Sequence, residues 1–242
     1  MQELDLNNIW IDNDGNYPDH IKRDNSIIDP NHNIQVYFRN LETHLIKHIE
    51  QADAILGCIA WLTSGSILDV LATKEVVSLV VQKEDFLRPD MGAKSDWKNW
   101  LKSKYSALNC KIERYNFIDN IISRLSVCSD PTLDPIRCVG NCNQDKVPAF
   151  PRMHNKFIIF AKLLNVSEDE ENSDFINVVP YAVWTGSFNL TKNAGRSLEN
   201  ALFIKDPEVV RAYYEEYGQI VAISEPLNWE KDWVKPQWRI GT

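Results

Sequence analysis

The chain has 242 residues, of which 44% are hydrophobic and 25% charged, and its formal net charge is −8. These values are typical of a globular protein large enough to bury a core. The acidic balance argues against a general nucleic-acid coat protein, whose affinity comes from Lys and Arg meeting phosphates. It does not exclude an enzyme with a locally positive site. No apolar run approaches the roughly 18–20 residues that cross a bilayer, and the acidic start does not resemble a signal peptide, so we expect a cytoplasmic protein without a membrane partner.

The composition changes along the chain and predicts three regions. Residues 1–33 are rich in Asn, Asp and Pro and predict a mostly irregular N-terminal arm. Residues 34–222 read as one domain, and residues 223–242 as a C-terminal tail whose tryptophans pack back on it. The segment DNDGN at 12–16 begins like a calcium loop, but Tyr17 stands where that loop needs glycine, so calcium binding is not expected.

From residue 34 onwards, segments with the apolar pattern of a strand alternate with segments that have the apolar pattern of a helix. In the first half we expect strands at 34–38, 54–62, 76–82 and 110–115, and helices at 39–51, 65–73 and 94–105, the last with Trp97 and Trp100 in the core. Residues 126–152 are expected to be irregular. Strands at 153–160, 178–191 and 197–204 follow, and then a helix with Asp206 as its N-cap and Pro207 in its first turn. The near-continuous apolar strands predict an α/β fold with a mixed, largely parallel β-sheet sandwiched between helices.

Two groups of residues could in principle bind a metal, and each has a simpler interpretation. Three of the five cysteines have a spacing that could contribute to a zinc site together with a fourth ligand such as His154, although buried thiols are the alternative: Cys128, Cys138 and Cys142. His44 and His48 lie four residues apart on the first expected helix, but a solvated helix face is favoured over a metal pair. His20 and His32 have no comparable companions.

Three short motifs lie at the ends of consecutive strands in the second half of the chain. They are His154-x-Lys156, the turn Gly186-Ser187-Phe188-Asn189, and Glu199-Asn200. Residues i and i+2 of a strand share a face, so His154 and Lys156 are expected to project together. If the three strands are neighbours, these side chains meet at one rim of the sheet, where α/β folds usually bind ligands.

Each residue type at this rim has a role in phosphoryl transfer. An imidazole can attack phosphorus and hold the group covalently. Lysine, asparagine and serine can donate to the phosphate oxygens as negative charge builds on them. A carboxylate can fix the tautomer of the attacking imidazole. This chemistry needs neither a metal nor a cofactor, but it requires a second imidazole to protonate the leaving oxygen.

The motifs H-x-K, G-S-x-N and E-N occur in this order, the last before an apolar strand. This order resembles the motif pattern of the phospholipase D superfamily, and most of all that of its small nucleases with a single H-x-K motif. The resemblance covers residues 34–222. It implies a metal-independent endonuclease that hydrolyses nucleic-acid phosphodiester bonds through a phosphohistidine at His154. Because the chain has one H-x-K motif, the resemblance also implies a homodimer in which both copies of His154 share one site. It further implies that Lys156, Asn189 and Ser187 bind the phosphate and that Glu199 orients the histidine.

One position departs from the family pattern, in which an aspartate follows the lysine after four further residues. Ala161 stands there, which puts a local turn in doubt, although the acidic segment 167–174 could replace the aspartate. The departure keeps one alternative open, a catalytically silent nucleic-acid-binding or scaffold module. A phospholipid phosphodiesterase is a second alternative, which the lack of an amphipathic membrane helix disfavours. By analogy with stand-alone bacterial members, a role in defence is conceivable. Four residues are further candidates for substrate binding: Arg152, Gly186, Lys192 and Arg196.

Overall fold

A computed structural model describes residues 23–83, 85–87, 96–110, 115–117, 134–142, 147, 149–166 and 175–232. Several predictions concern residues outside these ranges. They include the calcium-like segment, most of the N-terminal arm, His20, Cys128, the acidic segment 167–174 and the last two tryptophans of the tail.

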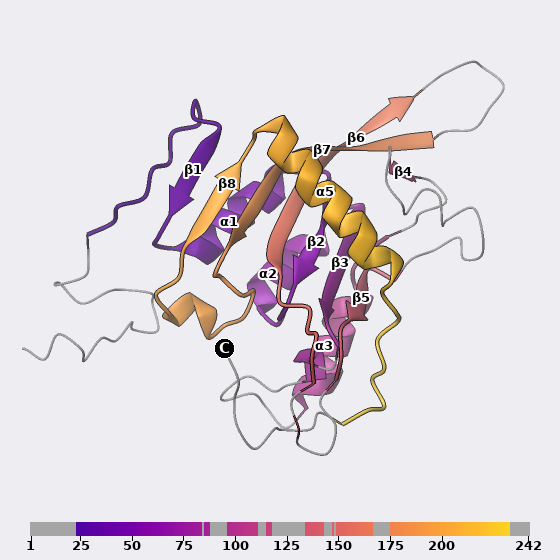
Figure 1. The fold of residues 1–242 in the computed structure, drawn as a ribbon. Coiled ribbons are helices and arrows are strands. Elements are labelled where there is room, and N and C mark those ends of the chain that lie inside the picture. Colours follow the sequence, from indigo (N-terminus) through magenta and orange to yellow (C-terminus); the bar gives the residue numbers. More distant parts are fainter. Residues whose placement is uncertain are drawn as a thin grey trace, which may run out of the picture.

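The centre of the molecule is one eight-stranded mixed sheet (Figure 1). The strand order is β1-β8-β7-β6-β2-β3-β5, and β4 pairs with β7 beside this path. The strands are β1 (Ile34–Tyr37), β2 (Ala54–Ile59), β3 (Val76–Gln82), β4 (Tyr115–Phe117), β5 (Ile136–Val139), β6 (Lys156–Val166), β7 (Phe175–Gly186) and β8 (Ala201–Ile204). The predicted mixed α/β class is confirmed. Among the described strands, β2 with β3, β3 with β5 and β4 with β7 pair in parallel, so the parallel share is smaller than the sequence suggested.

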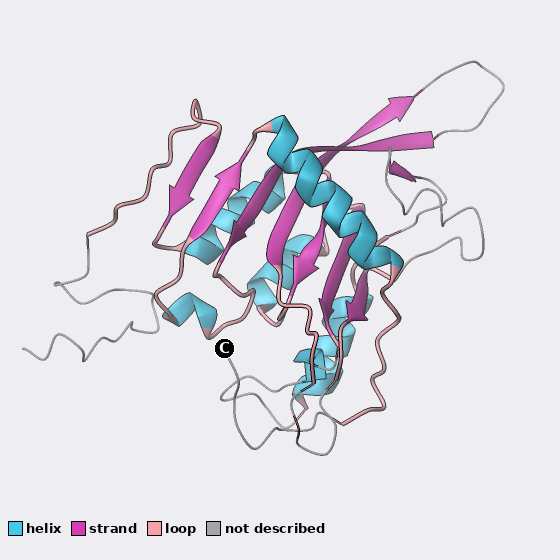
Figure 2. Ribbon diagram, in the orientation of Figure 1, coloured by secondary structure: helices cyan, strands magenta, loops and turns pink. Residues whose placement is uncertain are grey.

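Helices cover both faces of the sheet, as predicted (Figure 2). One face carries α1 (Leu41–Gln51), α2 (Gly65–Leu71) and α3 (Trp97–Ser106), and the other carries α5 (Pro207–Ala222). Two short 3-10 turns lie at Asp85–Leu87 and Ala194–Arg196. The predicted N-cap of α5 is confirmed, because the Asp206 carboxylate accepts hydrogen bonds from the backbone N–H groups of Glu208 at 3.2 Å and Val209 at 3.1 Å.

The two core layers explain why the central strands read as continuous apolar runs. Along β2, Ile55 and Ile59 face the layer of α1, α2 and α3, whereas Leu56 and Cys58 face the layer of α5. A strand buried on both faces needs apolar side chains at every position rather than at alternate ones. Trp229 adds to the first layer, because its ring packs edge-on against Phe86 and Tyr105.

Some element boundaries and side chains differ from the predictions. Strand β5 lies inside the segment that was expected to be irregular, and β6 begins at Lys156 rather than at residue 153. β8 begins only at Ala201, so Glu199 and Asn200 precede it. Trp100 is 41% exposed, because the neighbouring Leu101 takes the buried position of α3.

The turn considered near Ala161 does not exist, because β6 continues as a strand to Val166. Ala161 is fully buried and lies at a register shift of the β6–β7 pair. A carboxylate reaches this point of β6 from another part of the chain. The Asp53 side chain accepts a hydrogen bond from the backbone N–H of Leu163 at 3.2 Å and lies 3.3 Å from the ammonium of Lys162. The bulged strand is therefore held by an acidic residue at the start of β2.

The prediction of a solvated helix face for His44 and His48 is wrong for His48. Its ring stacks on Phe203 with the centroids 3.8 Å apart and an interplanar angle of 9°. Its Nε2 lies 2.9 Å from the hydroxyl of Tyr37, a fully buried side chain that also contacts His44. The residue is part of an aromatic cluster between α1 and the sheet, which helical periodicity alone did not indicate.

The described cysteines form no disulfide bond. Cys138 is buried, and its Sγ lies 3.7 Å from the carbonyl of Pro226, while Cys142 lies 3.2 Å from the ammonium of Lys231. Among the described residues, no three His, Cys, Asp or Glu side chains gather in a way that could hold a metal ion. In the same part of the chain, no helix combines the length and apolar character needed to cross a bilayer.

Candidate active site

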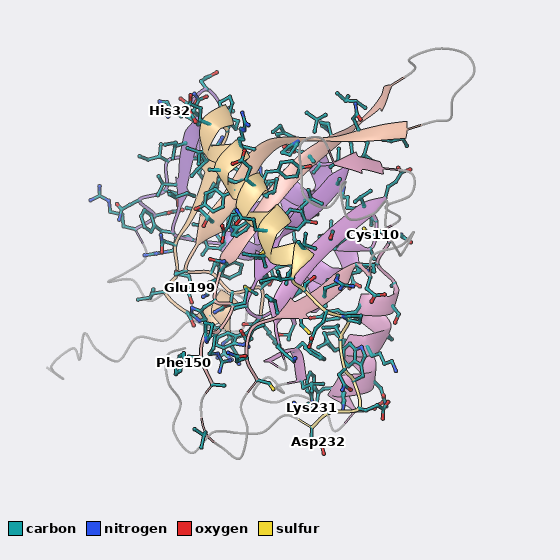
Figure 3. All side chains as sticks on the ribbon, turned by 45° about the vertical axis from the view of Figure 1, so that its right-hand side comes forward. His32, Cys110, Phe150, Glu199, Lys231 and Asp232 are labelled. Atoms are coloured by element: carbon teal, nitrogen blue, oxygen red, sulfur yellow. The ribbon has the colours of Figure 1, made fainter. Side chains whose placement is uncertain are left out.

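Strand register brings the three sequence motifs to one rim of the sheet. Lys156, the first residue of β6, pairs with Ile59 at the end of β2. The neighbouring Phe157 pairs with Thr185 near the end of β7, and Gly186 pairs with Ala201 at the start of β8. The antiparallel pairing thus places the beginnings of β6 and β8 beside the ends of β2 and β7. Figure 3 shows Glu199 and Phe150, which belongs to the segment leading into His154, at this same end of the sheet.

His154 and Lys156 are in direct contact. The Lys156 ammonium lies 3.2 Å from Nδ1 and 3.3 Å from Nε2 of His154, and it donates to the His154 carbonyl at 3.1 Å. His154 is exposed, while Lys156 is half-buried. Burial lowers the pKa of Lys156, and the negative charge of Glu199 partly opposes this effect. The pair therefore presents an accessible imidazole beside a cation that water solvates incompletely.

Ser187 and Glu199 form the second part of the rim. The Ser187 hydroxyl donates to the Glu199 carboxylate and accepts a hydrogen bond from the backbone N–H of Asn200 at 3.1 Å. The Ser187 N–H in turn donates to the Asn200 carbonyl at 3.1 Å. These bonds close the loop between β7 and β8 at its base and fix the carboxylate close enough to influence Lys156. Orientation of His154 by Glu199 remains a prediction.

Gly186 is required by the close approach of β7 and β8. A Cβ atom at this position would lie 2.2 Å from the carbonyl oxygen of Asn200 and 2.8 Å from the Cα of Ala201. Both are backbone atoms, so neither can rotate away. The structure thus gives Gly186 a packing role at the rim, and the predicted contact with substrate remains a prediction.

Asn189 lies where the loop after β7 crosses the end of β2. Its side chain is 8% exposed, and its Oδ1 is buried without a hydrogen-bond partner among the described residues. The backbone around it is fixed, because Leu190 donates to the Trp61 carbonyl at 3.1 Å and accepts from the N–H of Thr63 at 2.8 Å. The amide is therefore held beside the rim, and its role in phosphate binding remains a prediction.

The three predicted cationic contacts lie on the segments that flank the rim. Arg152 is half-buried and precedes His154 by two residues, in a β-bridge with Gly140. Lys192 and Arg196 are exposed in the loop between β7 and β8. Their role in substrate binding remains a prediction.

Sequence reasoning missed two residues next to His154. The ring of Trp61 lies 6.0 Å from the His154 imidazole at an interplanar angle of 86°. The side chain of Gln82, which is 1% exposed, accepts a hydrogen bond from the backbone N–H of Met153 at 2.6 Å. Their common signal is an amphipathic or polar residue directly at or after the end of a buried strand. This pattern predicts that such a residue lies at the rim, but it does not predict which other rim residue the side chain contacts.

Comparison with known proteins supplies one relative and several distant structures. No model of a known protein family matches the chain. An uncharacterized protein of Acanthamoeba polyphaga mimivirus is 35% identical in an alignment of 209 residues that covers 81% of this chain and 68% of the viral protein. The chain belongs to the family of this viral protein. The name of that relative states no activity, so membership in its family assigns none to this chain.

Among solved structures, NucT from Helicobacter pylori is 14% identical with a TM-score of 0.46, over 80% of this chain and 98% of that one. Nuc from Salmonella typhimurium, a phospholipase D family member, is 18% identical with a TM-score of 0.46, over 79% and 95%. A phosphatidylserine synthase from Haemophilus influenzae is 14% identical with a TM-score of 0.37, over 88% and 43%. Since these TM-scores are below 0.5, we base the functional proposal on the residues of this chain.

Proposed function

We propose that the protein is a phosphodiesterase that cleaves nucleic acid through a covalent phosphohistidine at His154. The observation that carries this proposal is the contact between His154 and Lys156 at a rim that also holds Ser187, Asn189 and Glu199. An accessible imidazole beside a lysine suits attack on a phosphate, because the ammonium neutralises the phosphate oxygens while the ring nitrogen approaches phosphorus. The ordered motifs, which resemble those of the phospholipase D superfamily, support the same chemistry.

In the first step, a ring nitrogen of His154 forms a bond to phosphorus and the bond from phosphorus to the leaving oxygen breaks. In the proposed step, Lys156 and the Asn189 amide donate to the non-bridging oxygens as the negative charge on these oxygens increases. The leaving oxygen takes up one proton. In the second step, water attacks phosphorus, the bond to the His154 nitrogen breaks, and the phosphate product leaves.

The proton for the leaving oxygen requires a second acid at the site. We propose that the protein is a homodimer and that the imidazole of the partner subunit's His154 supplies this proton and later accepts one from water. The supporting observation is that His154 lies exposed at the rim, where a second copy can approach it. In such a dimer, two copies each of the exposed Lys192 and Arg196 would lie around the shared site. They would give it a local positive field, although the net charge of the chain is −8.

A catalytically silent nucleic-acid-binding module is the alternative that the missing motif aspartate favours. The position in question, Ala161, is buried in the middle of β6, where Asp53 caps the neighbouring backbone. The bulge is thus supported without that aspartate, and the substitution speaks less against catalysis than the sequence implied. A phospholipid substrate has no comparable support in the described part of the chain.

The test is cleavage of end-labelled DNA and RNA oligonucleotides, single-stranded and duplex, in excess EDTA. We expect cleavage by the wild type, and a loss of at least about 1,000-fold in His154→Ala, as for other nucleophile deletions. His32→Ala is a matched control, because His32 is exposed near the opposite end of the sheet (Figure 3). Quenching with alkali should preserve a labelled oligonucleotide attached to the wild-type protein.

Three outcomes would contradict parts of the proposal. Cleavage that persists in His154→Ala would exclude His154 as the nucleophile, and cleavage that needs a divalent metal would exclude the proposed chemistry. Binding of the oligonucleotides without cleavage would favour the silent module. Light scattering tests the assembly separately, because a strict monomer would leave the site without its second imidazole.

A further inference from the structure

The buried end of β3 is tied to the segment that carries His154 through one glutamine side chain. Gln82 is 1% exposed. Its Nε2 donates to the carbonyls of Lys83 at 3.1 Å and Asn141 at 2.9 Å, and its Oε1 accepts from the N–H of Met153 at 2.6 Å. All of its partners are backbone groups, and they belong to three separate parts of the chain.

These bonds close the segment from residue 140 to residue 153 at its base. Gly140 and Arg152 form an antiparallel bridge, and the Asn141 N–H donates to the carbonyl of Pro151 at 3.0 Å. Gly140 has a φ of +98°, and a Cβ there would lie 2.6 Å from the Gln82 Oε1. The backbone therefore approaches Gln82 closely at a position that only glycine occupies without strain.

His154 lies between two backbone anchors. On one side, the Met153 N–H is held by Gln82, and on the other, the Asn155 carbonyl accepts from the Ala60 N–H at 2.9 Å. Ala60 is itself linked to Gln82, whose backbone N–H donates to the Ala60 carbonyl at 3.3 Å. The exposed imidazole contacts Lys156 and faces the Trp61 ring, and the flanking peptides determine where it meets these two side chains.

We propose that Gln82 is a positioning residue for His154, which it orients through the Met153 peptide without touching the reacting atoms. The inference rests on the proposed function and adds to it a residue from a strand outside the sequence motifs. A glutamine suits this task because a neutral amide both donates to two carbonyls and accepts from an N–H. Misplacement of a nucleophile by about 1 Å costs roughly 100-fold in rate, so loss of the anchor should reduce kcat far more than it changes KM.

Two substitutions at Gln82 separate orientation from general stability. Gln82→Met keeps the length of the side chain and removes its hydrogen bonds. Gln82→Glu keeps the shape, but an ionised carboxylate cannot donate to the carbonyls of Lys83 and Asn141, whereas a protonated carboxyl can donate to one of them. Gln35→Met is the matched control, since Gln35 is 5% exposed, is hydrogen-bonded to Tyr37, and lies on β1 at the other edge of the sheet.

We expect Gln82→Met to lower kcat by about 10- to 100-fold at nearly constant KM, and Gln35→Met to lower it less than about threefold, comparable to a peripheral change. The activity of Gln82→Glu, divided by that of the wild type at the same pH, should rise as the pH falls. Equal losses of kcat in the two methionine variants, or a pH-independent ratio, would overturn the proposal. If Gln82→Met does not fold, the pH dependence of the activity of Gln82→Glu relative to the wild type tests the proposal instead.

Failure of the proposed function is distinguishable from failure of this inference. If the wild type cleaves nothing, the imidazole NMR signals of His154, assigned by their loss in His154→Ala, still report on positioning. They should shift in Gln82→Met and stay in place in Gln35→Met. Unchanged His154 signals in Gln82→Met would overturn the positioning role whether or not the protein is an enzyme.

Discussion

His48 gives the protein a pH dependence of stability that its surroundings explain. The Tyr37 hydroxyl donates to Gln35 Oε1 at 2.5 Å, so the contact of 2.9 Å between this hydroxyl and His48 Nε2 requires that Nε2 carries the imidazole hydrogen. The Nδ1 atom is buried and has no partner among the described residues. Protonation would therefore create a buried N–H that no described residue accepts.

Burial accordingly lowers the pKa of His48 from 6.5 to about 4, and repulsion from His44 adds to the effect. The folded state binds fewer protons than the unfolded state between these values, so the free energy of unfolding falls as the pH drops from 6.5 towards 4. One pKa unit corresponds to about 1.4 kcal/mol. Because the ring is only partly shielded from water, we expect about 1–2 kcal/mol rather than the full value.

The assay is urea unfolding between pH 7 and the acidic limit of solubility, with the wild type and His48→Phe compared at each pH. Phenylalanine keeps an aromatic ring for stacking on Phe203 and removes the titration. The loss of stability on acidification should be about 1–2 kcal/mol smaller in His48→Phe than in the wild type, whereas His32→Phe, at an exposed position, should follow the wild type. An identical loss in the wild type and His48→Phe would refute the assignment of this titration to His48.

Two further predictions concern the rim. Gly186→Ala places a Cβ against the backbone of Asn200 and should lower the free energy of unfolding by about 2–3 kcal/mol, while Gly195→Ala, with no atom within 4 Å of its Cβ, should change it little. A smaller loss in Gly186→Ala than in Gly195→Ala, measured by urea unfolding, would contradict the predicted clash. Because burial lowers the pKa of Lys156, cleavage should decline on the alkaline side at a lower pH than an ordinary lysine allows. In Lys156→Arg, if this variant is active, the alkaline decline of kcat/KM should occur at a higher pH. A decline at the same pH as in the wild type would assign the titration to another group.

The sequence predicted what depends on local periodicity. The apolar runs of β2 and β3, the capping pair at Asp206 and Pro207, and the placement of His154, Ser187 and Glu199 near strand ends all follow from patterns within a few residues. Their convergence required only that β6, β7 and β8 be neighbours, which the antiparallel pairing confirms.

The remaining features depend on long-range contacts that no local pattern records. Gln82 and Met153 are 71 residues apart, and Asp53 and Leu163 are 110 residues apart. His48 looked like a surface residue because helical periodicity gave no indication that Phe203 would cover it. β5 was missed because its four residues alternate between buried and partly buried positions over too short a run for the strand period to be recognised.

The long β6–β7 hairpin has a consequence for how the protein can be labelled. Its rim end carries the candidate site, whereas its other end, at the pair Val166 and Phe175, leaves the body of the sheet (Figure 1). The eleven residues of β6 separate the two ends by roughly 30 Å, given the rise of a strand. A fluorophore or an affinity tag attached near this end, for example at the exposed Leu164, should therefore allow immobilisation and single-molecule observation without covering the rim.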